Sequence, residues 1–147
     1  MAIFSHPLKW IFATAILAGT TAVPAQAPSL AMLDMLEKGS WQLRERGEQT
    51  VAQTMCFGDA RKMIQLFHPR ANCSRYIIED TPKSVTVHYT CPGAGHGRTS
   101  IRSETNRLVQ IDTQGIADGK PFSQAYEARR SGACAAGGGG RGSLRRV

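Results

Sequence analysis

The four cysteines, Cys56, Cys73, Cys91 and Cys134, are the side chains of this 147-residue chain best suited to chemistry. A thiolate can attack an electrophile, bind a metal ion or form a disulfide. No two of the cysteines are separated by two residues, so the chain lacks the Cys-x-x-Cys motif of redox enzymes. An even number of cysteines in an exported chain indicates disulfides, so we predict two bonds, for which three pairings are possible. The alternative for Cys56 is an unpaired, reactive thiol.

Three histidines beyond the N-terminal region, His68, His88 and His96, could act as bases or metal ligands. Their spacing is not that of zinc ligands, so we predict no metal site. The run CPGAGHG at residues 91–97 lacks the Lys-Ser/Thr pair of a phosphate-binding loop, and the chain has no Gly-x-Ser-x-Gly motif. We therefore predict no catalytic, cofactor-binding or metal-binding residues and no cofactor. The alternative is a hydrolase that uses His88 or His96 as its base.

Residues 1–27 have the features of a secretory signal. Residues 10–18 are apolar apart from one threonine, and Ala25-Gln26-Ala27 matches the small-x-small pattern of a cleavage site. The apolar run is shorter than the roughly 20 residues that a membrane-spanning helix needs. We expect cleavage after Ala27, a periplasmic or secreted protein, and no membrane span after cleavage. An uncleaved anchor is the alternative.

The stretch from Cys73 to Cys91 predicts a β-hairpin, because two runs rich in β-branched and aromatic residues flank a turn around Pro82. A turn centred on that proline places four pairs opposite one another: Cys73 and Cys91, Arg75 and Tyr89, Ile77 and Val87, and Glu79 and Val85. A shift of one residue would put the two cysteines on opposite faces. This register favours a Cys73–Cys91 disulfide and leaves Cys56–Cys134. The sequential pairing, Cys56–Cys73 with Cys91–Cys134, is the alternative.

Short alternating segments separated by turn residues make up most of the remaining chain. We expect further strands at residues 39–46, 50–56, 98–103, 107–113 and 122–130, a flexible loop at residues 92–97, and a turn at Asp118-Gly119. A helix is expected at residues 58–67 with Asp59 as its cap, and a shorter one at residues 29–38 with Ser29 as its cap.

These elements predict a mainly β fold: an antiparallel meander of about seven strands forming a curved sheet or open barrel, with one or two short helices and two disulfides. Residues 28–134 would form this single domain. Residues 135–147, rich in glycine and arginine and without an apolar pattern, are expected to be disordered.

Several of these residues also define a resemblance to a known family. Gly39-x-Trp41, then Cys56, the Cys73–Cys91 hairpin, and a closing Arg129-Arg130-x-Gly132-x-Cys134 together resemble the bacterial domain-of-unknown-function family 3617, over about residues 38 to 134. The resemblance implies a small exported protein and supplies no catalytic residues. Family members often carry a Met/Pro-rich insert between their first two strands, whereas this chain has only residues 47–49 there.

The net charge of +7 suggests contact with an anionic partner. Five arginines lie in or near the tail: Arg129, Arg130, Arg141, Arg145 and Arg146. Export argues against nucleic acid, so an anionic envelope lipid or polysaccharide fits better. A small apolar ligand between the sheet and the helix at residues 59–67 is a second possible partner. We expect a non-catalytic binding or structural module of the cell envelope, and the sequence predicts no oligomeric state.

The disulfide pairing can be tested on the purified protein. We expect peptide mapping without reducing agent to recover Cys73 linked to Cys91, because the hairpin register brings these residues together. The same digest after reduction is the control. A peptide that joins Cys56 to Cys73 would contradict the predicted register.

Overall fold

The computed structural model describes residues 28–135, which form seven β-strands, one short α-helix and one short 3-10 helix. The strands are β1 (Gly39–Glu45), β2 (Gln53–Phe57), β3 (Ser74–Asp80), β4 (Ser84–Cys91), β5 (Gly95–Thr105), β6 (Leu108–Ala117) and β7 (Lys120–Gly132), and the helices are α1 (Ala31–Asp34) and η1 (Ala60–Gln65). The signal predicted at residues 1–27 and the tail beyond residue 135 lie outside the described residues. None of the helices within residues 28–135 has the length and hydropathy required to span a membrane.

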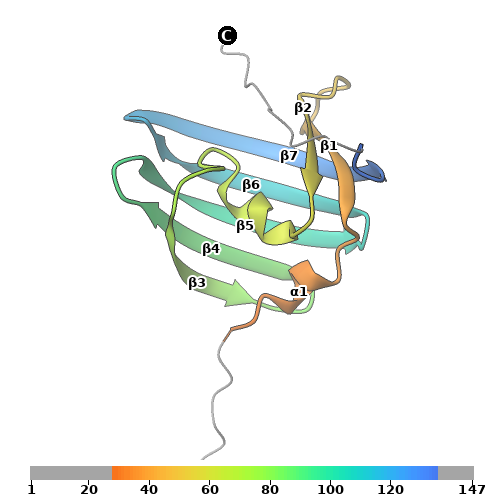
Figure 1. Cartoon of the computed structure of the whole chain (residues 1–147), viewed down its shortest axis with the longest axis horizontal. Helices are drawn as coiled ribbons and strands as arrows, with labels where there is room; N and C mark the ends of the chain where they lie inside the picture. Colours follow the sequence, from red (N-terminus) through yellow and green to blue (C-terminus); the bar gives the residue numbers. More distant parts are fainter. Residues whose placement is uncertain (1–27, 136–147) are drawn as a thin grey trace, which may run out of the picture.

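All seven strands belong to one antiparallel sheet with the order β2-β1-β7-β6-β5-β4-β3. Strands β3 to β7 form a meander, and β1 then pairs with β7 at the other end of the chain. The sheet is open and curved, and both helices lie against its concave face (Figure 1). The predicted mainly β fold is therefore confirmed.

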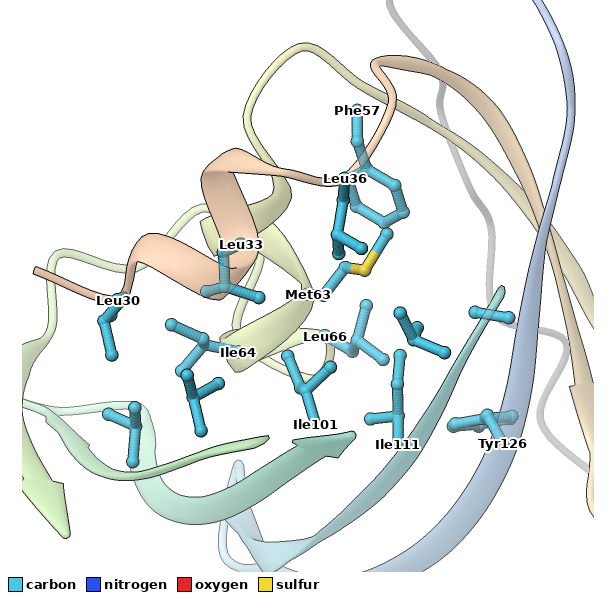
Figure 2. Close-up of a cluster of buried hydrophobic side chains, with 14 of the residues drawn as sticks. Leu30, Leu33, Leu36, Phe57, Met63, Ile64, Leu66, Ile101, Ile111 and Tyr126 are labelled. Carbon is cyan, nitrogen blue, oxygen red and sulfur yellow. The ribbon is translucent and has the colours of Figure 1, made fainter. Parts of the chain in front are cut away.

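The concave face carries the hydrophobic core. Strand β1 shows the predicted alternation, since Trp41 and Leu43 have no exposed surface while their neighbours are partly exposed. Figure 2 shows Leu33 of α1 and Ile64 of η1 lying over Ile101 and neighbouring side chains of the sheet. Burying apolar side chains from both layers stabilises the curved sheet, because each would otherwise expose an apolar face to water.

Residues 58–73 connect the two edge strands by crossing the concave face, and we call them the crossing segment. The two disulfides lie at its ends. Cys56 in β2 bonds to Cys134 just after β7, with 5.6 Å between their Cα atoms, and Cys73 bonds to Cys91 at the end of β4. The favoured pairing is therefore confirmed, and within residues 28–135 no cysteine is free, so the alternative of a reactive Cys56 thiol is wrong.

The predicted helix within the crossing segment is present but shorter, and it is a 3-10 helix. Its predicted cap is correct, since the Asp59 carboxylate accepts a hydrogen bond from the Arg61 amide at 2.9 Å. The Arg61 side chain also forms an ion pair with Asp34 of α1, which links the two helices. The predicted Ser29 cap is wrong: Leu30 occupies the cap position with a φ of 55°, and no side chain caps α1.

The β3–β4 hairpin follows the predicted register through Ile77, which lies opposite Val87. Beyond this pair an irregularity of the β-bulge type shifts the pairing, so that Glu79 lies opposite Thr86 and not opposite Val85 as predicted. The extra residue in β3 leaves Ile78 without a partner and 48% exposed.

The predicted flexible loop at residues 92–97 is largely wrong. Only a tight turn follows β4, and β5 already begins at Gly95. Gly97 pairs with Tyr89 on β4, and a Cβ atom at Gly97 would lie 2.5 Å from the phenolic oxygen of Tyr89. The glycine therefore leaves room on the concave face for the buried Tyr89 ring.

A Gly97→Ala substitution is expected to lower the free energy of unfolding by about 2 kcal/mol, because the added methyl group collides with Tyr89 in a packed core. Urea unfolding of the oxidised protein measures this change. Gly58→Ala is the matched control: no atom lies within 4 Å of a Cβ at Gly58, so its effect should stay within about 0.5 kcal/mol. Equal stability of the two variants would contradict the contact between Gly97 and Tyr89.

Candidate ligand-binding site

A groove of about 960 Å³ lies between β2 and the crossing segment. Most of its lining residues fall between residues 53 and 75, and two more come from distant positions of the chain. The lining residues are Gln53, Met55, Cys56, Phe57, Gly58, Lys62, Gln65, Leu66, Phe67, His68, Pro69, Arg70, Ala71 and Arg75, with Ala94 and Asp118. The volume lies at the upper end of the range for pockets that bind small molecules.

The groove does not lie where the sequence places an apolar ligand. The space between the sheet and η1 is filled by core side chains, since Met63 and Ile64 have no exposed surface (Figure 2). The groove lies beside η1, where Leu66 and Phe67 follow the helix. This correction moves the candidate ligand from under the helix to its flank.

Apolar side chains form one wall of the groove. Met55 and Phe57 project from β2, and Leu66 and Phe67 project from the crossing segment. The Phe67 ring stacks on Phe122 of β7, with 4.1 Å between the ring centroids. Stacking against the sheet fixes the orientation of Phe67 and gives the groove a preformed aromatic surface.

Cationic side chains surround this apolar wall. Lys62, Arg70 and Arg75 line the groove, whereas Asp118 is its only carboxylate among the described residues. Lys62 and Arg70 are exposed to solvent, and Arg75 projects from β3 on the same face as the half-buried Ile77. The groove therefore combines an apolar wall with an excess of positive charge.

Gln65 holds the crossing segment in shape at the base of the groove. Its buried amide nitrogen donates hydrogen bonds to the carbonyl oxygens of His68 and Ala71, at 2.9 and 3.1 Å. Its amide oxygen accepts a hydrogen bond from the Arg75 guanidinium at 3.0 Å. One side chain thus fixes both the loop that borders the groove and the position of Arg75.

His68 is buried and makes two hydrogen bonds through its ring. Its Nε2 lies 3.2 Å from the Ala94 carbonyl oxygen, which can only accept, so Nε2 carries the proton. In the neutral ring Nδ1 then accepts a hydrogen bond from the Tyr89 hydroxyl at 3.2 Å. His68 therefore ties the end of η1 to both sides of the β4–β5 turn, a role that goes beyond ending the helix.

A buried polar network continues from Tyr89 beneath η1. The Thr99 hydroxyl donates a hydrogen bond to the Ile64 carbonyl oxygen at 2.6 Å and lies 2.7 Å from the Thr113 hydroxyl. Burial raises the pKa of Tyr89 to about 12, and the nearby Thr113 hydroxyl partly offsets this rise. Within residues 28–135 no buried side-chain nitrogen or oxygen lacks a hydrogen-bond partner, so the network is fully satisfied.

The two histidines considered as catalytic bases lie on the opposite, convex face of the sheet. His88 of β4 and His96 of β5 have ring centroids 6.0 Å apart. The hydrogen bonds of the described residues include none from either imidazole to a carboxylate or a hydroxyl group. The Ser100 hydroxyl on the same face bonds to Thr86 instead. The fold thus places both histidines close together without the partners of a catalytic dyad.

The basic residues near the end of β7 are engaged with the fold. Arg129 pairs with Glu127 at 3.3 Å, and Arg130 pairs with Glu37 at 3.3 Å and donates to the Lys38 carbonyl oxygen. The other three arginines of the predicted basic cluster lie outside the described residues. No group of three or more potential metal ligands occurs within residues 28–135.

No protein-family model, curated protein or solved structure matches this chain. The resemblance to family 3617 stays a prediction from the residues that define it.

The raised pKa of Tyr89 predicts a loss of stability at alkaline pH. The folded state holds the phenol proton up to a pH of about 12, whereas the unfolded chain releases it near 10. The resulting stabilisation is complete below pH 10 and is lost as the pH rises through 12, with an upper limit of about 3 kcal/mol. Urea unfolding at a series of pH values from 8 to about 11 measures the decline.

Tyr89→Phe is the control for this prediction. It removes the ionisable group and the hydrogen bond to His68, so the variant should be less stable at neutral pH and should lose less stability above pH 10. An unchanged alkaline decline in Tyr89→Phe would show that another group causes it. Tyr126 is the first to test, because burial and the nearby Glu45 also raise its pKa.

Proposed function

We propose that this protein is an exported, non-catalytic binding module of the cell envelope that holds a small apolar ligand in the groove beside η1. The observation that carries the proposal is the groove itself, which joins a volume of about 960 Å³ to a wall made of Met55, Phe57, Leu66 and Phe67. Ligand sites in proteins are concave, largely apolar and largely preformed. The stacked Phe67 and the Gln65 hydrogen bonds meet the last of these conditions.

The two disulfides support the exported location. Disulfides persist in oxidising compartments such as the bacterial periplasm and are rare in the cytosol. The signal features of residues 1–27 point in the same direction. A periplasmic or secreted location after cleavage at Ala27 is therefore part of the proposal.

The non-catalytic part of the proposal rests on His68, the most chemically versatile side chain that lines the groove. Both of its ring nitrogens are used in hydrogen bonds, to Ala94 and Tyr89, that hold the fold together. A general base needs a free nitrogen within reach of the substrate proton. His68 is therefore better placed to shape the wall of a binding site than to transfer a proton.

A conservative polar substitution in the apolar wall tests the proposal. Met55→Gln keeps the side-chain length but adds an amide that must be desolvated, so it should weaken binding of the neutral dye N-phenylnaphthylamine about tenfold, measured by fluorescence titration. Thr54→Gln is the matched control, because Thr54 lies on the other face of β2. Native mass spectrometry of protein purified from its own compartment should also reveal a retained ligand.

Two results would contradict the proposal. The first is the absence of measurable dye binding by the unaltered, oxidised protein. The second is equal binding by the Met55→Gln and Thr54→Gln variants, which would place the dye somewhere other than in the groove.

A further inference from the structure

We infer that the ligand of the groove is an anionic amphiphile, with one apolar chain against the wall of the groove and a carboxylate or phosphate headgroup between Arg70 and Arg75. This inference rests on the proposed function and adds the chemical class of the ligand. It follows from the distribution of paired and unpaired charges, from the fixed position of Arg75, and from the arrangement of apolar and cationic side chains along one groove.

The arginines of the described residues differ in whether they are paired. Six of them form ion pairs with carboxylates: Arg46, Arg61, Arg102, Arg107, Arg129 and Arg130. The salt bridges within residues 28–135 include none for the four others, which are Arg44, Arg70, Arg75 and Arg98. Two of these four line the groove, where Lys62 is also without an ion pair. Three cationic side chains without an ion pair to a carboxylate of residues 28–135 therefore line the groove together with its apolar side chains.

Arg75 is oriented before any ligand binds. One terminal nitrogen of its guanidinium donates to the Gln65 amide oxygen at 3.0 Å, and Gln65 is itself buried and fixed by two backbone carbonyl groups. A guanidinium has five N–H donors, so the others stay available for an oxyanion. Because the side chain is already ordered, less conformational entropy is lost when a headgroup binds.

The headgroup position follows from where the cations lie. Arg70 belongs to the crossing segment and Arg75 to β3, and both line the groove. Two arginines can together bind one carboxylate or phosphate through charge-assisted hydrogen bonds, which are stronger than hydrogen bonds between neutral groups. Asp118 is the one lining carboxylate, so the groove keeps an excess of positive charge even with this residue ionised.

The position of the ligand's apolar chain follows from the apolar side chains that line the groove. Met55 and Phe57 of β2 line the groove together with Leu66 and Phe67 of the crossing segment. Phe57 and Leu66 are buried, so the half-buried Met55 and Phe67 supply most of the apolar contact. A ligand with both an apolar chain and an anionic head satisfies the two surfaces together. A neutral apolar molecule would leave the cationic side chains solvated and gain nothing from them.

The test compares ligands that share a chain and differ in the headgroup. Isothermal titration calorimetry on the oxidised protein at low salt should give dodecanoate and dodecyl phosphate at least tenfold lower Kd values than the neutral dodecanol. The difference should shrink as salt is added, because exposed charges are screened. Acetate and inorganic phosphate, which present the headgroup alone, should bind at least a hundredfold more weakly.

Substitutions at the cations provide the second arm. Arg75→Gln and Arg70→Gln should each raise the Kd for dodecanoate about tenfold and leave the Kd for dodecanol within about twofold. Arg102→Gln is the matched control, because Arg102 of β5 pairs with Glu104 and does not line the groove. Lys62→Gln removes a cation that lines the groove but is not one of the two that bind the headgroup, so it should give a smaller effect in the same direction. Lys62 has no hydrogen bond to Gln65 to lose, so this variant serves if Arg75→Gln does not fold.

The outcomes separate this inference from the proposed function. If neither dodecanoate nor dodecanol binds, the groove is not an apolar ligand site and both proposals fail. If dodecanol binds as tightly as dodecanoate, or if the arginine variants bind dodecanoate as the unaltered protein does, the binding module stands and the anionic class of ligand is refuted. Binding of inorganic phosphate as tight as that of dodecyl phosphate would likewise refute an amphiphilic ligand.

Discussion

The structure depends on closing the concave face of one curved sheet. An open sheet with an apolar face is not stable in water until another layer covers it, and within residues 28–135 α1 and the crossing segment form that layer. One disulfide, Cys56–Cys134, joins β2 just before the crossing segment to the residues after β7, and the other, Cys73–Cys91, bonds the last residue of the segment to β4. In the chain-entropy model these bonds contribute about 4.5 and about 3 kcal/mol, a large share of the stability of a domain this size. The covering layer can therefore be short and still leave room for a groove beside it.

Much of the fold follows from alternation in the sequence. Trp41 and Leu43 mark the buried face of β1, and the symmetry of the Cys73–Cys91 hairpin is sufficient to choose the disulfide pairing. The prediction of secondary structure fails where the same local composition is compatible with two different structures. Glycines at residues 93–97 usually mark a flexible loop, but Gly97 instead makes room for a ring on the next strand, which only the strand register reveals. The bulge after Ile77 has no sequence signal of its own.

The groove was not predictable from the sequence, because it forms between β2 and the crossing segment and is also lined by Ala94 and Asp118, which are distant in the chain. His68 looked like the residue that ends a helix, and its contacts with Tyr89 and Ala94 depend on how the crossing segment lies over the sheet. Arg75 was correctly placed opposite Tyr89, but a register gives no information about Gln65, which belongs to another layer. Periodicity identifies the faces of single elements, whereas a groove between layers depends on their relative positions.

The pairing of β1 with β7 has a consequence for how the chain folds. The β1–β2 hairpin is synthesised before the rest of the sheet, but its place is beside residues 120–132, which are synthesised after all the other strands. Until then Trp41 and Leu43 have no sheet to pack against, whereas β3 to β7 can pair in order as each strand follows the last. Such distant pairing slows folding, because a long loop must close before any contact compensates for the entropy lost. The meander can thus form first as a template, and the β1–β2 hairpin completes the sheet only when β7 is present.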